Sequence, residues 1–181
     1  MFTGRFELRH TYRGTLVRET ELLKDEVSGL SSQWHFEILF DFIFPIAHRG
    51  VNVALVIFGI DKAPGAEDEP SPPEHVAELG AAIGKVTRST DLVARFEDEL
   101  FICLLPLCNV QGGLIFADRI RDAIVDFRSE TGVTVSAGVT SYRGDQEVTK
   151  EDMLEAVRGA LASAHDKGGD RIEITSHAWS R

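Results

Sequence analysis

Hydrophobic side chains recur at helical spacing in two segments of the first half of the chain, and a continuous apolar run lies between them. The first segment, residues 33–48, carries the apolar stripe typical of an amphipathic helix, and Gly50 provides its end. Val51–Ile60 is apolar at all but one position, which indicates a strand covered on both faces. The second helical segment, residues 74–86, begins after Pro73, a residue favoured in a first helical turn.

Two apolar segments flank a short acidic run and predict a β-hairpin. Leu92–Ala94 enters the hairpin and Phe101–Leu105 leaves it, and both are apolar enough for buried strands. Glu97, Asp98 and Glu99 lie between them and need water, so we expect the turn to face solvent. Two buried strands make this tip a rigid place from which side chains can act.

The rest of the chain alternates between helix and strand. Helical spacing predicts a helix over about 109–127, and alternation over residues 133–139 predicts a half-buried strand. Thr149 and Asp152 form the pattern of a capping box that opens another helix, and residues 171–175 make a short last strand. The resulting order, α-β-α-β-β-α-β-α-β, predicts an α/β (α+β) fold with a ferredoxin-like mixed central sheet and helices packed on it.

Two further segments lie outside this alternation. Residues 16–30 are rich in helix formers, with leucines at helical spacing, and predict a lead-in helix that either packs on its own domain or mediates dimerisation. Residues 63–73 combine prolines with acids and predict an exposed loop. We therefore expect an N-terminal extension with the lead-in helix over residues 1–30, one domain over 31–175 and a tail over 176–181.

Composition narrows the functions that this fold could carry. The 181 residues, 43% of them hydrophobic, suffice for one well-buried domain. The net charge of -10 argues against nucleic acid or an anionic membrane as the main partner, so an anionic small ligand would need a local cluster of arginines. No apolar segment is long enough to span a bilayer and the N-terminus lacks a signal-peptide core, so we expect a cytoplasmic protein.

Cysteine and histidine give no sign of a metal site in the sequence. Cys103 and Cys108 lack paired spacing for a metal or a disulfide framework, and we expect them to be reduced. The six histidines show no metal-binding spacing, and no Ser, His and Asp set has a motif around it. The hairpin remains the segment whose residues indicate chemistry.

The hairpin and the residues before it resemble the signature of the GGDEF domain, the diguanylate cyclase family. In that family R-x-x-D is followed, after five residues, by G-G-D-E-F, with an A-R pair just before the turn. Arg88 and Asp91 hold the R-x-x-D places, Ala94 and Arg95 hold the pair, and Phe101 holds the final aromatic place.

Four residues of this signature depart from the family pattern. Glu97, Asp98, Glu99 and Leu100 stand where Gly, Gly, Asp or Glu, and Glu would be. Residues 25–36 partly match the family's entry motif, D-x-L-T-G-L-P-N-R-x-x-F. Over most of its length the chain therefore resembles a degenerate GGDEF domain.

The resemblance implies that the catalytic site is lost. The family's metal-binding carboxylates fall here at Gly59 and Leu100, and its phosphate-binding Lys and Arg fall at His165 and Gly169. The guanine-binding Asn and Asp belong to the region of the proline-rich loop. Because Mg²⁺ needs hard oxygen ligands, we expect no enzyme activity, no catalytic residue and no bound Mg²⁺.

The same resemblance implies that the chain retains the residues of a second site of the family. The R-x-x-D pair belongs to a separate inhibitory site for the product, cyclic di-GMP, and an arginine of the next helix completes it. Counting from the hairpin places that arginine at Arg119, so the resemblance implies a ligand site of Arg88, Asp91 and Arg119. An arginine fork can bind guanine O6 and N7 or grip phosphate, and a carboxylate accepts from guanine N1 and N2. The alternative is a plain surface pair of Arg88 with Asp91, because R-x-x-D recurs at Arg95–Asp98 and Arg119–Asp122.

These inferences predict a catalytically inactive receptor that binds cyclic di-GMP and signals through a partner protein, by an interaction surface rather than a fused effector. Binding of the ligand as an intercalated pair of molecules would also favour homodimers. A second hypothesis is a ligand-independent pseudoenzyme scaffold that binds protein only. The third is a residual diguanylate cyclase in which Asp61 and Glu99 form a shifted metal pair.

Overall fold

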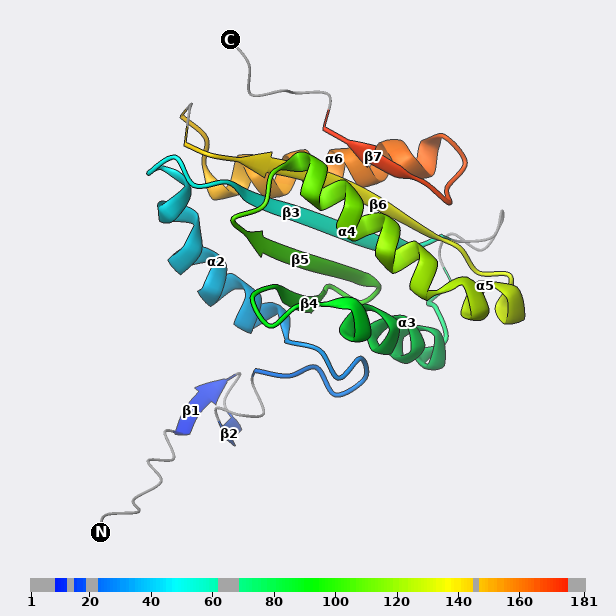
Figure 1. Ribbon diagram of the computed structural model, residues 1–181. Coiled ribbons are helices and arrows are strands. Elements are labelled where there is room, and N and C mark those ends of the chain that lie inside the picture. Colours follow the sequence, from blue (N-terminus) through cyan, green and yellow to red (C-terminus); the bar gives the residue numbers. More distant parts are fainter. Residues whose placement is uncertain (1–8, 13–14, 19–22, 62–68, 145–146, 176–181) are drawn as a thin grey trace.

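A five-stranded sheet in the order β4-β5-β3-β6-β7 forms the centre of the computed structural model, which describes residues 9–12, 15–18, 23–61, 69–144 and 147–175 (Figure 1). The strands are β3 (Val53–Ile60), β4 (Leu92–Phe96), β5 (Leu100–Pro106), β6 (Val135–Tyr142) and β7 (Ile172–Ile174). Neighbouring strands run antiparallel except for β6 and β7, which are parallel. The sheet is therefore mixed, as the sequence predicted.

Helices cover both faces of the sheet (Figure 1). On one face lie α2 (Gln33–Ala47) and α6 (Lys150–Asp166), and on the other α3 (Pro73–Val86), α4 (Val110–Ala123) and α5 (Val125–Thr131). All residues of β3 are buried, and its alternate side chains enter the two cores. This confirms the predicted central strand with helices on both sides.

Polar side chains fix the starts of three helices. Ser32 and Asn109 each accept a backbone N–H in the first turn, of α2 and of α4 respectively. The predicted capping box of α6 is confirmed, because the Thr149 hydroxyl accepts from the Asp152 N–H while the Asp152 carboxylate accepts from the Thr149 N–H.

The single helix predicted over 109–127 is instead divided. α4 ends at Ala123 and α5 begins at Val125. Ile124 between them leaves helical geometry, with φ -101° and ψ 11°. The bend brings Ile124 and Phe127 into the core that Ile120 already occupies, and this burial outweighs the helical preference of the segment.

The described residues of the predicted lead-in helix, 16–18 and 23–30, are not helical. β1 (Arg9–Tyr12) and β2 (Thr15–Arg18) pair as an antiparallel hairpin, and residues 25–28 form a turn. The Asp25 carboxylate accepts both the N–H and the hydroxyl of Ser28, at 2.7 Å each, which draws the chain out of helical geometry. Residues 19–22 and 62–68 lie outside the described residues, and in the described part of the predicted loop residues 69–72 form no helix or strand.

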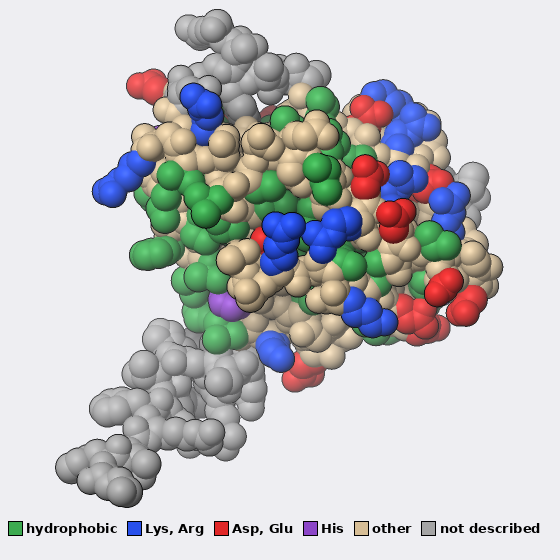
Figure 2. Space-filling view, in the orientation of Figure 1, with side chains coloured by type: hydrophobic (Ala, Val, Ile, Leu, Met, Phe, Trp, Pro, Cys, Tyr) green, Lys and Arg blue, Asp and Glu red, His purple; other side chains and the backbone are tan. Residues whose placement is uncertain are grey.

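The outer face of α2 carries exposed apolar side chains. Phe42 is 74% exposed, Ile38 43% and Ile46 40%. Figure 2 shows apolar side chains gathered over this helix. Even so, no helix in the described ranges is both long and apolar enough to cross a bilayer.

Candidate functional site

The turn between α3 and β4 holds two of the three predicted ligand residues. The Asp91 carboxylate accepts the backbone N–H of Arg88 at 3.1 Å, and the Asp91 N–H donates to the Arg88 carbonyl at 3.1 Å. These two bonds close the turn and fix Asp91 at the start of β4. The Arg88 guanidinium is exposed and forms no hydrogen bond or ion pair with the described residues.

The third predicted residue reaches the same turn from α4. Nη2 of Arg119 donates to the carbonyl of Val86, the last residue of α3, at 2.5 Å. A cation at this position also offsets the negative end of the helix dipole. Only one of the guanidinium's five N–H donors is used in this bond. The fold therefore brings Arg88, Asp91 and Arg119 around one turn, on the face where Figure 2 shows lysine and arginine side chains.

A partly exposed thiol lies beside this turn. Burial raises the pKa of Cys108, the Asp91 charge raises it further, and the Arg88 charge opposes both. Cys103 is fully buried in β5, and burial raises the pKa of its thiol well above the ordinary value. Neither cysteine takes part in a disulfide within the described part of the chain.

The tip of the β4–β5 hairpin is held by two helices. The Glu97 carboxylate pairs with Arg158 of α6, with Oε1 2.5 Å from Nη2, and the Glu97 N–H donates to Gln33 of α2 at 3.2 Å. Arg95 closes the turn from inside, since Nη2 donates to the Asp98 carbonyl at 2.6 Å. Glu97 has a φ of 59°, in the left-handed region that glycine adopts without strain. The tip keeps a backbone suited to glycine although glycine is absent.

This strain gives a prediction for Glu97→Gly. Removing the left-handed strain gains about 1 kcal/mol, and losing an exposed ion pair costs about as much or less. We expect the glycine variant to match or exceed the stability of the unchanged protein in urea unfolding. Glu97→Ala loses the ion pair and keeps the strain, so it should be the less stable of the two variants. An alanine variant more stable than the glycine variant would contradict the prediction.

Below the tip, three of the four positions that the resemblance assigns to metal and phosphate ligands lie together, namely Gly59, Leu100 and His165. Gly59 pairs with Leu100 across β3 and β5. A Cβ at Gly59 would lie 3.3 Å from each of three side-chain atoms, in Leu100, Leu161 and His165. The space next to Gly59 is therefore bordered by two leucines and an imidazole, with no carboxylate among these neighbours.

Asp61, directly after β3, is a structural acceptor, a role that the sequence did not predict. Its Oδ1 accepts from the Ser136 hydroxyl at 2.6 Å, and its Oδ2 accepts from the Thr134 hydroxyl at 2.6 Å and the Asp170 N–H at 2.9 Å. The side chain is only 12% exposed, and His165 Nε2 lies 3.4 Å from Oδ1. The carboxylate thus joins β3 to β6 and to the turn before β7.

The Glu99 side chain binds a different segment of the chain than Asp61 does. Its carboxylate accepts the N–H of Ser71, in the segment that leads into α3. Over the described ranges, no three His, Cys, Asp or Glu side chains are placed to hold a metal ion together. The two carboxylates of the residual-cyclase hypothesis, Asp61 and Glu99, therefore each bind a different part of the protein.

The Asp25 carboxylate forms the other anchor of the hairpin. Burial raises its pKa, but the backbone and hydroxyl bonds from Ser28 and the nearby Arg95 charge together outweigh burial, and the pKa is lowered from its ordinary 3.8. Arg95 Nη1 lies 3.2 Å from Asp25 Oδ2. Ionised Asp25 therefore ties the entry segment to the strand before the tip.

The lowered pKa predicts a pH-dependent contribution of Asp25 to stability. A depressed folded-state pKa gives stability that is present above the ordinary value of 3.8 and is lost as the pH falls through the folded value. Asp25→Asn should therefore be less stable than the unchanged protein at pH 7, and the difference should shrink in acid. Denaturant unfolding at neutral and acidic pH measures this difference in stability. Glu26→Gln, at an exposed position, is the control. A difference that stays constant with pH would contradict the prediction.

Comparison with known families shows to which family the chain belongs. The family model described as diguanylate cyclase, GGDEF domain, matches residues 74–171, more than half of the chain. The chain belongs to the GGDEF family. It is 33% identical over 101 residues to diguanylate cyclase DgcP of Pseudomonas aeruginosa, and 29% identical over 105 residues to diguanylate cyclase A of Treponema denticola. These matches take in 53% and 55% of the chain but only 15% and 28% of the relatives, so the chain spans a small part of their length.

Solved GGDEF domains have the same fold. The GGDEF domain of DgcB from Caulobacter crescentus, in complex with c-di-GMP, aligns with a TM-score of 0.74 and 19% identity, over 86% of this chain and 96% of that one. The GGDEF domain of FimX from Pseudomonas aeruginosa aligns with a TM-score of 0.70 and 18% identity, over 83% of this chain and 98% of that one. Diguanylate cyclase SiaD from the same organism, in complex with its activator SiaC, aligns with a TM-score of 0.70 and 23% identity, over 86% of this chain and 64% of that one. The α/β fold predicted from the sequence is confirmed.

Proposed function

We propose that this GGDEF domain is a catalytically inactive receptor that binds cyclic di-GMP at Arg88, Asp91 and Arg119 and signals through a partner protein. One observation carries the proposal. Arg119 of α4 reaches the α3–β4 turn that holds Arg88 and Asp91, and the Arg88 guanidinium there is exposed with no partner in the described residues.

The chemistry of these groups suits a guanine dinucleotide. Each arginine can bind guanine O6 and N7 or a phosphate with paired donors, and Asp91 can accept from guanine N1 and N2. The chain has a net charge of -10, so an anionic ligand needs this local positive charge. The likeness to a GGDEF domain of known structure in complex with c-di-GMP supports this choice of ligand.

Loss of catalysis is supported by the residues that border Gly59. Chemistry on GTP needs Mg²⁺ held by carboxylates near the triphosphate. Leucine side chains at positions 100 and 161 offer no oxygen ligand, and the Asp61 carboxylate already accepts three hydrogen bonds. We therefore propose no cofactor for this chain.

Calorimetric titration of cyclic di-GMP tests the receptor proposal, with GTP as the control ligand. We expect the unchanged protein to bind and Arg88→Ala to bind about tenfold or more weakly, because one paired arginine contact contributes about 1–3 kcal/mol. Arg49→Ala removes the same charge beside α2, on the other side of the sheet, and should bind normally. Equal binding by both variants, or no heat and no thermal stabilisation of the unchanged protein, would refute the site.

A ligand-independent scaffold is the second candidate, and the exposed apolar face of α2 favours it. Phe42 is 74% exposed, which suits a surface covered by another protein. Absence of guanine-nucleotide binding would make this the better proposal. Formation of cyclic di-GMP from GTP with Mg²⁺ or Mn²⁺ would instead support the residual cyclase.

A further inference from the structure

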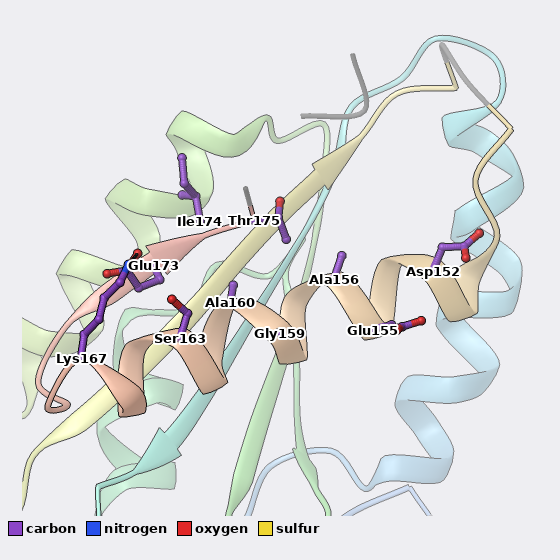
Figure 3. A pocket seen from close by; sticks show the side chains of 10 residues that line it. All are labelled: Asp152, Glu155, Ala156, Gly159, Ala160, Ser163, Lys167, Glu173, Ile174 and Thr175. Carbon is purple, nitrogen blue, oxygen red and sulfur yellow. Dashed lines mark hydrogen bonds and ion pairs between the residues drawn. The ribbon is translucent and has the colours of Figure 1, made fainter. Parts of the chain in front are cut away.

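Strand β7 borders a groove that no part of the proposed nucleotide site uses. The groove lies between β7 and α6 and has a volume of about 550 Å³ (Figure 3). The middle of its α6 wall consists of small side chains, Ala156, Gly159, Ala160 and Ser163, so the helix leaves room beside the strand. Residues 173–175 form the opposite wall.

The backbone of β7 offers hydrogen bonds along its outer edge. Arg171 accepts from the Ala137 N–H at 2.9 Å, and the Thr175 N–H donates to Val139 at 3.1 Å, so these alternate residues face β6. Because successive backbone groups of a strand point in opposite directions, the N–H and C=O of Ile172 and Ile174 point away from β6. β7 ends the strand order of the described sheet, so these groups lie on an open edge.

The charges of the groove favour one class of occupant. Three carboxylates line it, from Asp152, Glu155 and Glu173, and its single ammonium group, Lys167, already pairs with Glu173 at 2.7 Å. Figure 3 shows Asp152 and Glu155 at the end of the groove near Ala156 and Thr175, and Lys167 at the other end. The end near Thr175 is therefore acidic, with no basic side chain among its lining residues.

We propose that the groove binds an extended segment of a partner protein, which adds to β7 as a sixth strand and places basic side chains at the Asp152–Glu155 end. Its backbone would bond to the outward groups of Ile172 and Ile174, and side chains facing α6 would fit over the small residues. The inference does not depend on nucleotide binding, so either proposal can fail alone.

The test uses a fluorescein-labelled peptide of alternating valine and lysine, about six residues long, a usual strand length. A Cβ at Gly159 would meet nothing within 4 Å, so Gly159→Leu should fold normally and fill the groove, while Gly159→Ala leaves it open. Ile174→Pro removes an outward N–H without removing a bond to β6. A peptide with glutamate in place of lysine controls for charge.

By fluorescence anisotropy, the unchanged protein and Gly159→Ala should bind the lysine peptide. Ile174→Pro should bind about tenfold or more weakly, the effect of losing a hydrogen bond, and Gly159→Leu should also bind about tenfold or more weakly because its side chain fills the groove. The glutamate peptide should also bind more weakly, by an amount that falls with added salt.

Each of the following results would overturn the proposal: no binding by the unchanged protein, equal binding by Gly159→Leu, or binding that appears only after removal of residues 176–181, which would assign the groove to the chain's own tail. Dimers in sedimentation that Gly159→Leu abolishes would assign the groove to a second copy instead, and would also overturn it.

Discussion

Gly59→Asp, which returns a carboxylate to the family's metal position, is expected to lower the free energy of unfolding by about 3 kcal/mol or more and to restore no GTP turnover. The new side chain would enter a buried position whose three nearest neighbours, each 3.3 Å from its Cβ, belong to Leu100, Leu161 and His165. Two leucines cannot solvate a carboxylate, and the missing hairpin carboxylate would still leave a metal without its second ligand.

Gly59→Ala separates crowding from charge in this experiment. Its methyl group meets the same three atoms, but flexible side-chain ends can shift, so we expect a cost of about 1 kcal/mol. Urea unfolding of both variants, with and without Mg²⁺, measures the difference. If the aspartate variant were as stable as the alanine variant, or if Mg²⁺ stabilised it selectively, a usable metal pocket would remain and the proposed inactivity would fail.

Asp61→Ala is expected to lower the free energy of unfolding by about 3 kcal/mol, because it leaves three donors at a nearly buried position without their acceptor. Asp61→Asn keeps the shape and one carbonyl acceptor, so it should cost less. Urea unfolding of both variants measures the effect.

The same variants distinguish a structural Asp61 from a metal ligand. A structural acceptor predicts no thermal stabilisation of the unchanged protein by Mg²⁺ or Mn²⁺. Stabilisation by either ion that disappears in Asp61→Ala would revive the residual-cyclase hypothesis. An alanine variant of unchanged stability would show that the three donors find other partners.

The sequence predicted the helices and strands in which the pattern of apolar and polar residues matches the buried and exposed faces. The apolar residues of the unbroken run in β3, and those at helical spacing in the helices on either side of it, form the two cores. The absence of helix in residues 23–30 was not predicted, because helix propensity is weak compared with a local turn, here the one that Asp25 and Ser28 close. The break at Ile124 was missed for a similar reason, since core packing decides it.

The candidate site was predictable only in part. The R-x-x-D resemblance proposed Arg88 and Asp91, and counting from the hairpin proposed Arg119, but the contact that brings Arg119 to the turn is to the Val86 carbonyl, and a backbone acceptor leaves no mark in a sequence. The role of Asp61 depends on hydroxyls more than 70 residues away along the chain, at Thr134 and Ser136. Hydroxyl residues in a strand carry no signal for such a pairing.

The unequal exposure of the two thiols gives the proposed ligand site a built-in reporter. Cys103 is sealed in the core, whereas Cys108 is partly exposed and within electrostatic reach of Arg88 and Asp91. A maleimide dye should therefore label the native protein at Cys108 alone, slowly because the raised pKa keeps the thiolate scarce. Its emission would follow events at the α3–β4 turn in real time, without engineering a cysteine into the chain.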